Sequence, residues 1–517
     1  MKKIITILIP ILLGLLLAGC SDNVEYVTYN VVRGGTDSVA AEPRLTRLEF
    51  LADDNPALLI SDASCTITGD SAAECWVPHL MSGKRLVARF TVDGGGAELL
   101  ADGVRMESGA TAVDFSRPVR LTVSAGGLRR TYTVSVHAFT GLPVMWIETD
   151  GRQPITSKDE YTAARFRLTE DVATRSAGDI TEGTLQIRGR GNSTWYLLEK
   201  KPYRLRLDEK LPLLGMPASR HWVLLANHAD KTMLRNSLAL RMGSMSSMEW
   251  TPGAHFVELM LNGRYDGTYL LAEKVRVARS RVDVGDDGFL IEVDGKAGEE
   301  EGAVTLRVPH IAEAVSIEEP ATAAGAEAYE YISRFLSAAD SVLFSDGFAD
   351  PASGWRRYMD EDTFADWYVV NEVARNNDAA FYSSCYMSLR RGGKLKMGPL
   401  WDFDIAFGNV SYNGNYAVEG LWVGRVAWFA RLMQDPAFAA RVKERLEYFR
   451  SRRDELLAAI NADARYLRRS VEENDSRWGV LYDRTWPNYD IWGRYENEVQ
   501  HLKQWLTERM EWLRDNL

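Results

Sequence analysis

The chain has 517 residues, of which 46% are hydrophobic and 26% are charged, and these proportions are typical of folded globular proteins and exclude general disorder. Its length exceeds what one hydrophobic core supports, so we expect two or three domains. The net charge of −11 offers no basic surface of the kind that duplex nucleic acid requires, so we expect no nucleic-acid partner.

The first twenty residues predict a secretion signal. Two lysines precede an apolar run from Ile4 to Ala18 that is short for a bilayer span. The run ends in Leu17-Ala18-Gly19-Cys20, which resembles the lipobox of bacterial lipoproteins, where cleavage precedes a cysteine that is then lipidated. This resemblance implies a signal peptide over residues 1–19 and a membrane anchor at Cys20. Because Ser21 follows the cysteine, it also implies the outer membrane or cell surface, with the periplasmic side as an alternative. A plain signal peptide with an incidental cysteine is the competing interpretation.

The next segments predict a tether and then an all-β domain. Residues 20–42 are polar and lack a periodic apolar face, which favours a tether. Short alternating runs follow at Leu45–Phe50, Arg85–Val92, Val119–Val123 and Tyr132–Val136. Several short strands separated by glycine-containing turns are typical of a sandwich, so we predict an Ig-like β-sandwich over residues 43–140. It contains no catalytic group of residues, and a spacer or binding module is its expected role.

The remaining cysteines give two separate predictions. Cys65 and Cys75 lie in one short stretch and could form a disulfide in an oxidising compartment or remain free. Cys385 lies in a strand-like segment without a nearby His or Cys at metal-ligand spacing, so we expect a small buried residue there.

Beyond residue 141 the pattern changes to strands first and helices after. Strand-like runs span Leu185–Leu207, Val257–Leu261, Tyr265–Val275 and Phe289–Val293, with the turn Asn262-Gly263 as the strongest hairpin signal. Helical spacing covers Lys231–Met245, Ala326–Leu343, Asp362–Arg375 and most of Val426–Leu517. This order predicts an α+β domain over residues 141–450, followed by a helical extension over residues 451–517 that packs on it.

A small predicted hairpin within the helical part carries the most acidic site. Its strands flank Arg391-Gly392-Gly393, so the second strand should return Asp402 and Asp404 close to Asp378, which precedes the first strand. Residues i and i+2 share a face in an extended chain, so Asp402 and Asp404 point the same way if the strand continues that far. Three gathered carboxylates are suited to a hard cation such as Mg²⁺, although acids that cap or anchor turns are the alternative.

Residues suited to phosphate lie upstream. The segment 188–193 is a glycine-containing turn that exposes backbone N–H groups, and Lys200-Lys201 follows it. Such a turn alone is weak evidence, because ordinary hairpin loops share it. The order of glycine loop, lysine, helix, hairpin, helices, isolated Asp and Asp-Phe-Asp is the order of parts in kinase phosphoryl transfer.

Six ordered blocks of the sequence resemble the CotH family, the spore-coat protein H type of atypical kinase. They are "IRGRGNSTW" (187–195), "KKPYRLRLD" (200–208), "LLGMPASRHWVLLANHADKTMLRN" (213–236), "GTYLLAEKV" (267–275), "NND" (376–378) and "KMGPLWDFDIAFGN" (396–409). The resemblance covers roughly residues 145–450. It implies a divergent kinase-like fold that binds ATP with a divalent metal, Mg²⁺ or Mn²⁺, and phosphorylates serine or threonine in an unidentified protein partner.

The resemblance also implies roles for individual residues. Asp378 stands at the catalytic aspartate, Asp402 at the metal-binding aspartate, and Asp404 at a second metal ligand. The implied cofactor-binding residues are Arg190 and Asn192 in the glycine loop, Lys201 as the phosphate contact, and Glu273 in the nucleotide pocket or paired with a cation.

Two departures from the family pattern bear on activity. Ser383 stands where the family has an Asn five residues after the catalytic Asp, and the helix at Lys231–Met245 has no glutamate to pair with Lys201, a role that Glu273 could take. The alternative function is an inactive surface lipoprotein that binds glycan or matrix, or a structural assembly protein. In that case a carbohydrate groove is expected at the following tryptophans: Trp195, Trp401, Trp422 and Trp428.

Overall fold

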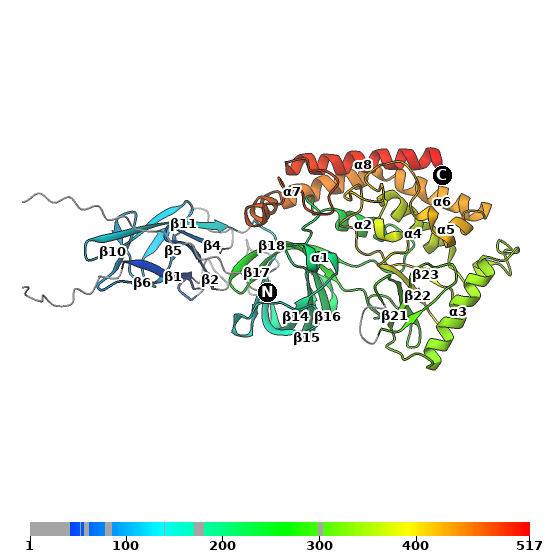
Figure 1. Cartoon of the computed structure of the whole chain (residues 1–517), viewed down its shortest axis with the longest axis horizontal. Coiled ribbons are helices and arrows are strands. Elements are labelled where there is room, and N and C mark those ends of the chain that lie inside the picture. Colours follow the sequence, from blue (N-terminus) through cyan, green and yellow to red (C-terminus); the bar gives the residue numbers. More distant parts are fainter. Residues whose placement is uncertain are drawn as a thin grey trace, which may run out of the picture.

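A computed structural model describes residues 42–51, 53–55, 62–77, 85–138, 140–169, 180–297 and 303–517. The predicted signal peptide, Cys20 and nearly all of the predicted tether lie outside these described residues. Along the described chain, an all-β part, a closed barrel and a part that mixes sheet and helices follow one another (Figure 1). The expectation of several sheets with mixed α and β content is therefore confirmed. None of the described helices is long and apolar enough to cross a bilayer.

The all-β part consists of two larger sheets and a strand pair. Its strands are β1 (Arg44–Phe50), β2 (Ala63–Ser64), β3 (Thr66–Thr68), β4 (Ala72–Val77), β5 (Arg85–Val87), β6 (Arg89–Asp93), β7 (Glu98–Ala101), β8 (Val104–Arg105), β9 (Ala112–Asp114), β10 (Val119–Ala125) and β11 (Leu128–Ala138). The sheet orders are β3-β4-β11-β10-β7-β8 and β2-β1-β6, with β5-β9 as the pair. Leu48 of the smaller sheet and Leu121 of the larger sheet belong to one buried core, so both sheets cover the same apolar interior.

The cysteines of this part lie close together, with Cys75 on β4 and Cys65 between β2 and β3. The β3–β4 register pairs Thr66 with Glu74, and one step further it brings Cys65 opposite Cys75. Both thiols are free. Burial raises the pKa of Cys65, and the neighbouring Cys75 thiol is the second cause of this shift. The Cys65–Cys75 disulfide stays a prediction.

A closed seven-stranded barrel follows. Its strands are β12 (Val144–Thr149), β13 (Thr162–Thr169), β14 (Ile180–Gly189), β15 (Tyr203–Leu213), β16 (Met216–Leu225), β17 (Ala254–Leu261) and β18 (Arg264–Glu273), in the order β12-β13-β14-β15-β16-β18-β17. Parallel pairing of β12 with β17 closes the barrel around an apolar interior that includes Trp222 and Leu205. The β17–β18 hairpin turns at Asn262-Gly263, where both residues have positive φ as a tight hairpin turn requires, and this prediction is confirmed.

Two local predictions near the barrel were wrong in detail. The β14–β15 connection is not a simple turn, because it contains the short helix α1 (Ser193–Leu197). The Lys201 ammonium donates a hydrogen bond to the Trp195 carbonyl of this helix. Helix α2 (Arg235–Ser244) begins four residues later than predicted, because Met233 adopts φ +60, which a right-handed helix cannot include.

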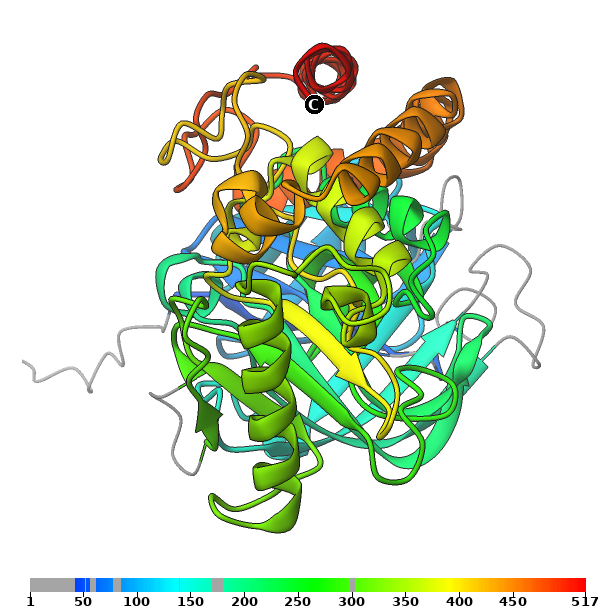
Figure 2. The same cartoon turned by 90° about the vertical axis from the view of Figure 1, so that its right-hand side faces the viewer.

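A second sheet and the remaining helices complete the fold (Figure 2). The strands are β19 (Phe289–Val293), β20 (Thr305–Leu306), β21 (Val315–Glu319), β22 (Cys385–Leu389) and β23 (Lys396–Met397), in the order β20-β21-β19-β22-β23. The helices are α3 (Glu327–Leu343), α4 (Glu361–Ala374), α5 (Ala427–Leu432), α6 (Pro436–Arg450), α7 (Arg453–Trp478) and α8 (Tyr495–Asn516), with short 3₁₀ turns at Asp150–Arg152, Trp355–Arg357, Asn377–Ala379 and Val423–Arg425. One large core joins this sheet and these helices to the outer barrel face at Val223 and Ala272.

The C-terminal helices pack as their apolar spacing predicts. Leu502, Trp505 and Leu513 of α8 are buried in the large core. Helix α7 lies against β18, because the Asn474 side chain accepts a hydrogen bond of 3.1 Å from the backbone N–H of Thr268. The chain beyond residue 451 therefore shares its core with the preceding part.

Candidate functional site

Asp378 lies in a short turn between α4 and β22. Helix α4 ends where Arg375 adopts φ +45, and the 3₁₀ turn Asn377–Ala379 follows directly. The Asn377 side-chain amide donates a hydrogen bond of 3.1 Å to the Asp378 carboxylate. Burial raises the pKa of Asp378 to about 7, and the negative charge of Asp402 is the second cause. The turn therefore holds a partly shielded carboxylate next to a second acid.

The small hairpin returns the chain to this turn as predicted, with Met387 paired to Met397 and Ser388 to Lys396. Strand β23 ends at Met397, however, and Asp402 has φ +64. The expectation that Asp402 and Asp404 share a face of an extended strand is therefore wrong, because the backbone has left the extended region before it reaches them.

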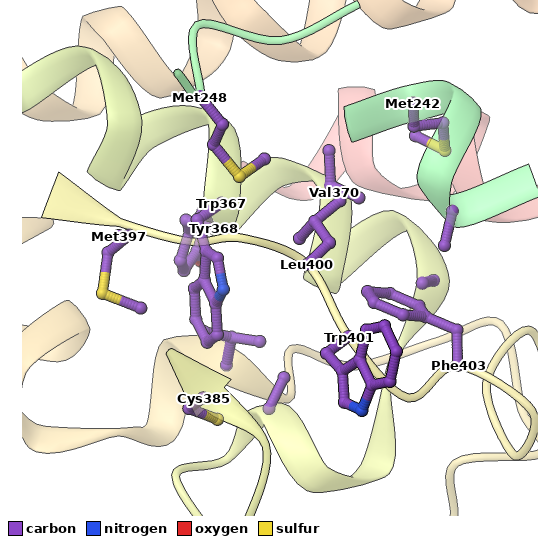
Figure 3. Close-up of a cluster of buried hydrophobic side chains, with 14 of the residues drawn as sticks. Met242, Met248, Trp367, Tyr368, Val370, Cys385, Met397, Leu400, Trp401 and Phe403 are labelled. Carbon is purple, nitrogen blue, oxygen red and sulfur yellow. The ribbon is translucent and has the colours of Figure 1, made fainter. Parts of the chain in front are cut away.

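Apolar side chains fix the loop that carries these acids. Trp401 and Phe403 flank Asp402 and are buried at 7% and 1% exposure. Figure 3 shows them close to Leu400 and Val370, so the residues on both sides of Asp402 are anchored in the core. Asp402 itself stays half-buried.

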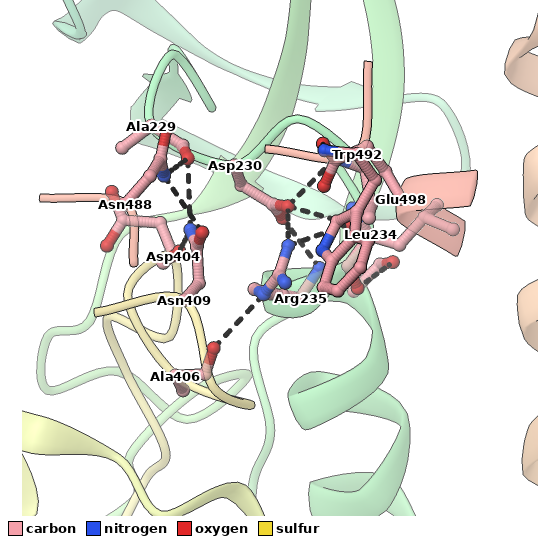
Figure 4. Close-up of polar contacts among 12 residues, drawn as sticks. Ala229, Asp230, Leu234, Arg235, Asp404, Ala406, Asn409, Asn488, Trp492 and Glu498 are labelled. Carbon is pink, nitrogen blue, oxygen red and sulfur yellow. Dashed lines mark hydrogen bonds and ion pairs between the residues drawn. The ribbon is translucent and has the colours of Figure 1, made fainter. Parts of the chain in front are cut away.

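Polar contacts from the "NHADKTMLRN" block hold the same loop (Figure 4). The Arg235 guanidinium donates to the Ala406 carbonyl at 3.0 Å and to the Asp230 carboxylate at 2.5 Å. The Asn236 side chain accepts a hydrogen bond of 2.8 Å from the backbone N–H of Phe403. Asn409 donates to the Asp404 carbonyl at 2.8 Å. Two sequence blocks more than 160 residues apart therefore form one support for the aspartate loop.

The three predicted acids share one electrostatic environment. Burial raises the pKa of Asp402, and Arg190 opposes that shift. Burial and the charges of Asp402 and Asp378 raise the pKa of Asp404. Within the described ranges, no three acidic, His or Cys side chains are grouped tightly enough to enclose a metal ion by themselves. One or two carboxylates are what Mg²⁺ takes from a protein when phosphate and water fill its other positions.

Arg190 bridges the barrel and the aspartate loop. Its guanidinium lies 5.6 Å from the ring centroid of Trp401, the residue before Asp402. The structure therefore places Arg190 close to the acids, and its role in cofactor binding stays a prediction.

The other loop residues bind within their own segment. The Lys201 ammonium donates to the carbonyls of Trp195 and Leu198 at 2.6 and 2.5 Å. The Asn192 side chain accepts a hydrogen bond of 3.0 Å from Lys158. In this structure both residues stabilise the loop around α1.

Glu273 forms a buried ion pair with Arg281, whose Nε lies 3.2 Å from the carboxylate, and both side chains are almost fully buried. Glu273 also accepts a hydrogen bond of 3.0 Å from the backbone N–H of Gly253. It pairs with a cation, but that cation is not Lys201.

Sequence reasoning missed residues at the end of β19. Asp294 and Lys296 lie close enough to Asp378 that their charges act on its pKa in opposite directions. The buried Glu292 carboxylate accepts a hydrogen bond of 3.1 Å from the backbone N–H of Ser384. The available signal was a buried strand ending in Asp294-Gly295, a polar turn at the edge of a sheet.

The tryptophans of the alternative function do not form a groove. Trp195, Trp401, Trp422 and Trp428 are all buried, at 9, 7, 5 and 0% exposure. A carbohydrate groove at these four residues was therefore a wrong expectation, because their rings fill the core.

Comparison with known proteins gives the family. The model of the CotH kinase protein family matches residues 187–513, which is more than half of the chain, and the chain belongs to this family. No curated protein matches the chain. Among solved structures, one from Bacteroides thetaiotaomicron, provisionally described as a glycoside hydrolase, is 18% identical with a TM-score of 0.16, and the match covers 37% of this chain and 54% of that one. The matched region therefore spans about half of that structure, and the likeness carries no argument about fold or function.

Proposed function

We propose that this chain is an extracytoplasmic CotH-like atypical kinase, with a divergent kinase-like fold, that transfers the γ-phosphoryl group of ATP to a serine or threonine of a protein partner. The observation that carries the proposal is the gathering of Asp378, Asp402 and Asp404 in one half-buried neighbourhood beside Arg190. Phosphoryl transfer needs a base for the attacking hydroxyl and oxygen ligands for a divalent metal, and a set of carboxylates supplies both.

The proposal gives each acid a task. Asp378 accepts the proton of the attacking hydroxyl, and Asn377 orients its carboxylate. Asp402 and Asp404 are the residues that would hold Mg²⁺ or Mn²⁺, and they fit such an ion because they are oxygen ligands whose negative charges are only partly offset by Arg190. A bound ion of this kind neutralises charge on the phosphate oxygens.

The proposal places the protein outside the cytoplasm as a lipoprotein. The support is the Leu17-Ala18-Gly19-Cys20 sequence after a short apolar run, with lipid attachment at Cys20 and an outer-membrane or cell-surface location. The partner is then a protein that is exposed in the same compartment.

Nucleotide binding tests the metal assignment. We expect ATP to raise the melting temperature of the purified protein only when Mg²⁺ or Mn²⁺ is present. Asp402→Ala should lose this metal-dependent shift, whereas Asp378→Ala should keep it. Asp346→Ala, at an exposed acid after α3, is the matched control and should behave as the parent does. A parent protein that shows no shift with any nucleotide would contradict the kinase proposal, and equal affinity with and without metal would contradict the Asp402 assignment.

A further inference from the structure

A row of cations lies on one outer face of the barrel. The β14–β15 register pairs Arg188 with Arg204, and the β15–β16 register pairs Arg206 with His221. The β16–β18 register, carried one step beyond Trp222 and Glu273, brings Lys274 opposite His221. Their alternating neighbours, such as Trp222, fill the barrel interior. The cationic side chains therefore share the face that turns away from the barrel core.

This face looks across to the second sheet and the acidic site. Lys274 is close enough to Glu292 of β19 for its charge to act on that carboxyl, and Arg190 acts in the same way on the Tyr386 hydroxyl of β22. Asp294, two residues after Glu292, in turn acts on Asp378. A chain of neighbouring charges therefore leads from the cations of the barrel through the second sheet to the candidate catalytic acids.

Few of these cations form ion pairs. Among the described residues, no ion pair within 4 Å involves Arg190, Arg204 or Lys274, although Glu318 and Glu319 lie close enough to Lys274 for their charges to offset part of its own. Buried nitrogens of Arg188, Arg204 and His221 have no hydrogen-bond partner. Buried polar groups are normally satisfied, and unpaired like charges normally avoid one another. In a chain with a net charge of −11, this arrangement indicates a place for an anion.

Mutual repulsion contributes to the lowered pKa of two of these groups. Burial lowers the pKa of Lys274 to about 8, Arg204 adds to the effect, and the charges of Glu318 and Glu319 oppose it. Burial also lowers the pKa of Arg204, with Arg188 and Arg190 among the further causes. An anion between these side chains would relieve both effects.

We infer that Arg204 and Lys274, with Arg190 at their edge, form a binding surface for a polyphosphate chain, and that they contact the nucleotide phosphates in place of Lys201. The Lys201 ammonium is already bound to the carbonyls of Trp195 and Leu198, whereas the buried Nε of Arg204 has no hydrogen-bond partner. The binding of a polyphosphate chain stands by itself. Only the statement that this chain belongs to ATP rests on the proposed function.

The test measures binding of inorganic tripolyphosphate and of ATP by calorimetry. Arg204→Met and Lys274→Met should each weaken tripolyphosphate binding about tenfold or more, because each removes a charge-assisted contact. Lys201→Met should weaken it less than about threefold. Lys210→Met, at an exposed lysine of the same strand, is the matched control. Loss of binding in Lys201→Met but not in the other two variants would overturn the inference.

Two further results separate this inference from the proposed function. Tripolyphosphate binding that depends on Arg204 and Lys274 without phosphoryl transfer to any protein would support the inference and count against the kinase. If the protein transfers phosphate and both Arg204→Met and Lys274→Met bind tripolyphosphate as the parent does, the kinase proposal is supported and this inference is contradicted. Misfolding is checked by melting without ligand, where both variants should be at least as stable as the parent because a repulsion has been removed. Arg204→Lys, which keeps the charge, should retain most of the binding.

Discussion

Replacing Arg235 with methionine tests how the aspartate loop is held. Arg235 and Asp230 are 2% and 0% exposed, and the substitution leaves a buried carboxylate without its cation. Breaking one partner of a buried ion pair costs about 3–5 kcal/mol. Asp230 keeps the donors Thr232 N, Thr232 Oγ1 and Arg235 N, so we expect the lower end, about 3 kcal/mol. The Ala406 carbonyl also loses its hydrogen-bond donor, so the substitution weakens the support of the loop that carries Asp402.

Urea unfolding followed by tryptophan fluorescence measures this loss. Trp76 is the single tryptophan before residue 140, so the other 14 of the 15 report the barrel and the helical part. Arg241→Met, at an exposed arginine of the same helix, is the control and should change stability by less than about 0.5 kcal/mol. The double variant Asp230→Asn, Arg235→Met should be more stable than the sum of the single changes predicts. A loss in Arg235→Met no larger than that of the control would refute the reasoning.

Three further predictions concern packing and titration. Gly189→Ala should destabilise the barrel by about 1–3 kcal/mol in the same urea assay, because a Cβ at this position overlaps the Trp195 ring, and an unchanged midpoint would contradict this. Burial lowers the pKa of His228 to about 4, so the unfolded chain takes up a proton first as pH falls below 6.5. Stability should therefore be full above pH 6.5 and fall towards pH 4 by at most about 3 kcal/mol, and His228→Gln should lack this share in urea titrations at pH 7 and 4.5. In the metal-free protein, NMR of the carboxyl carbon should show Asp378 titrating with a pKa of about 7, and Asp402→Asn should lower that pKa by removing a negative neighbour, whereas an unshifted midpoint would rule out the coupling.

Local signals in the sequence predicted much of the fold. Asn262-Gly263 fixes a hairpin because both positions need positive φ, and Phe289–Val293 is an apolar run bounded by polar turns that forms β19 as expected. The stripe that includes Leu502 and Trp505 has helical spacing and packs as predicted. Each of these features depends on residues that are close in the sequence.

Long-range features were not predictable in the same way. Closure of the barrel depends on parallel pairing between β12 and β17, which are more than 100 residues apart. The ion pair of Glu273 with Arg281 and the carbonyl contacts of Lys201 depend on how loops fold back, and residue type alone carries no information on them. The direction of Asp402 depended on where β23 ends, and strand ends are set by tertiary packing.

In the candidate site, too, local features were predictable from the sequence and long-range features were not. Its acids were found because Asp378 and Asp402 flank a hairpin with a clear turn signal. Arg204 and Lys274 were missed, because their shared face becomes apparent only when the register of four strands is known. The sequence therefore predicted the acids of the candidate site but not the cations that we infer to bind phosphate.

Label transfer tests the central claim most directly. The purified protein is incubated with ATP labelled in the γ-phosphate, Mg²⁺ or Mn²⁺, and an extract of extracytoplasmic proteins, and labelled Ser or Thr is then sought by mass spectrometry. The account predicts metal-dependent labelling by the parent, and none by Asp378→Ala even though this variant still binds ATP. Labelling that persists in Asp378→Ala, or a parent that binds ATP and metal and labels no protein, would contradict the account.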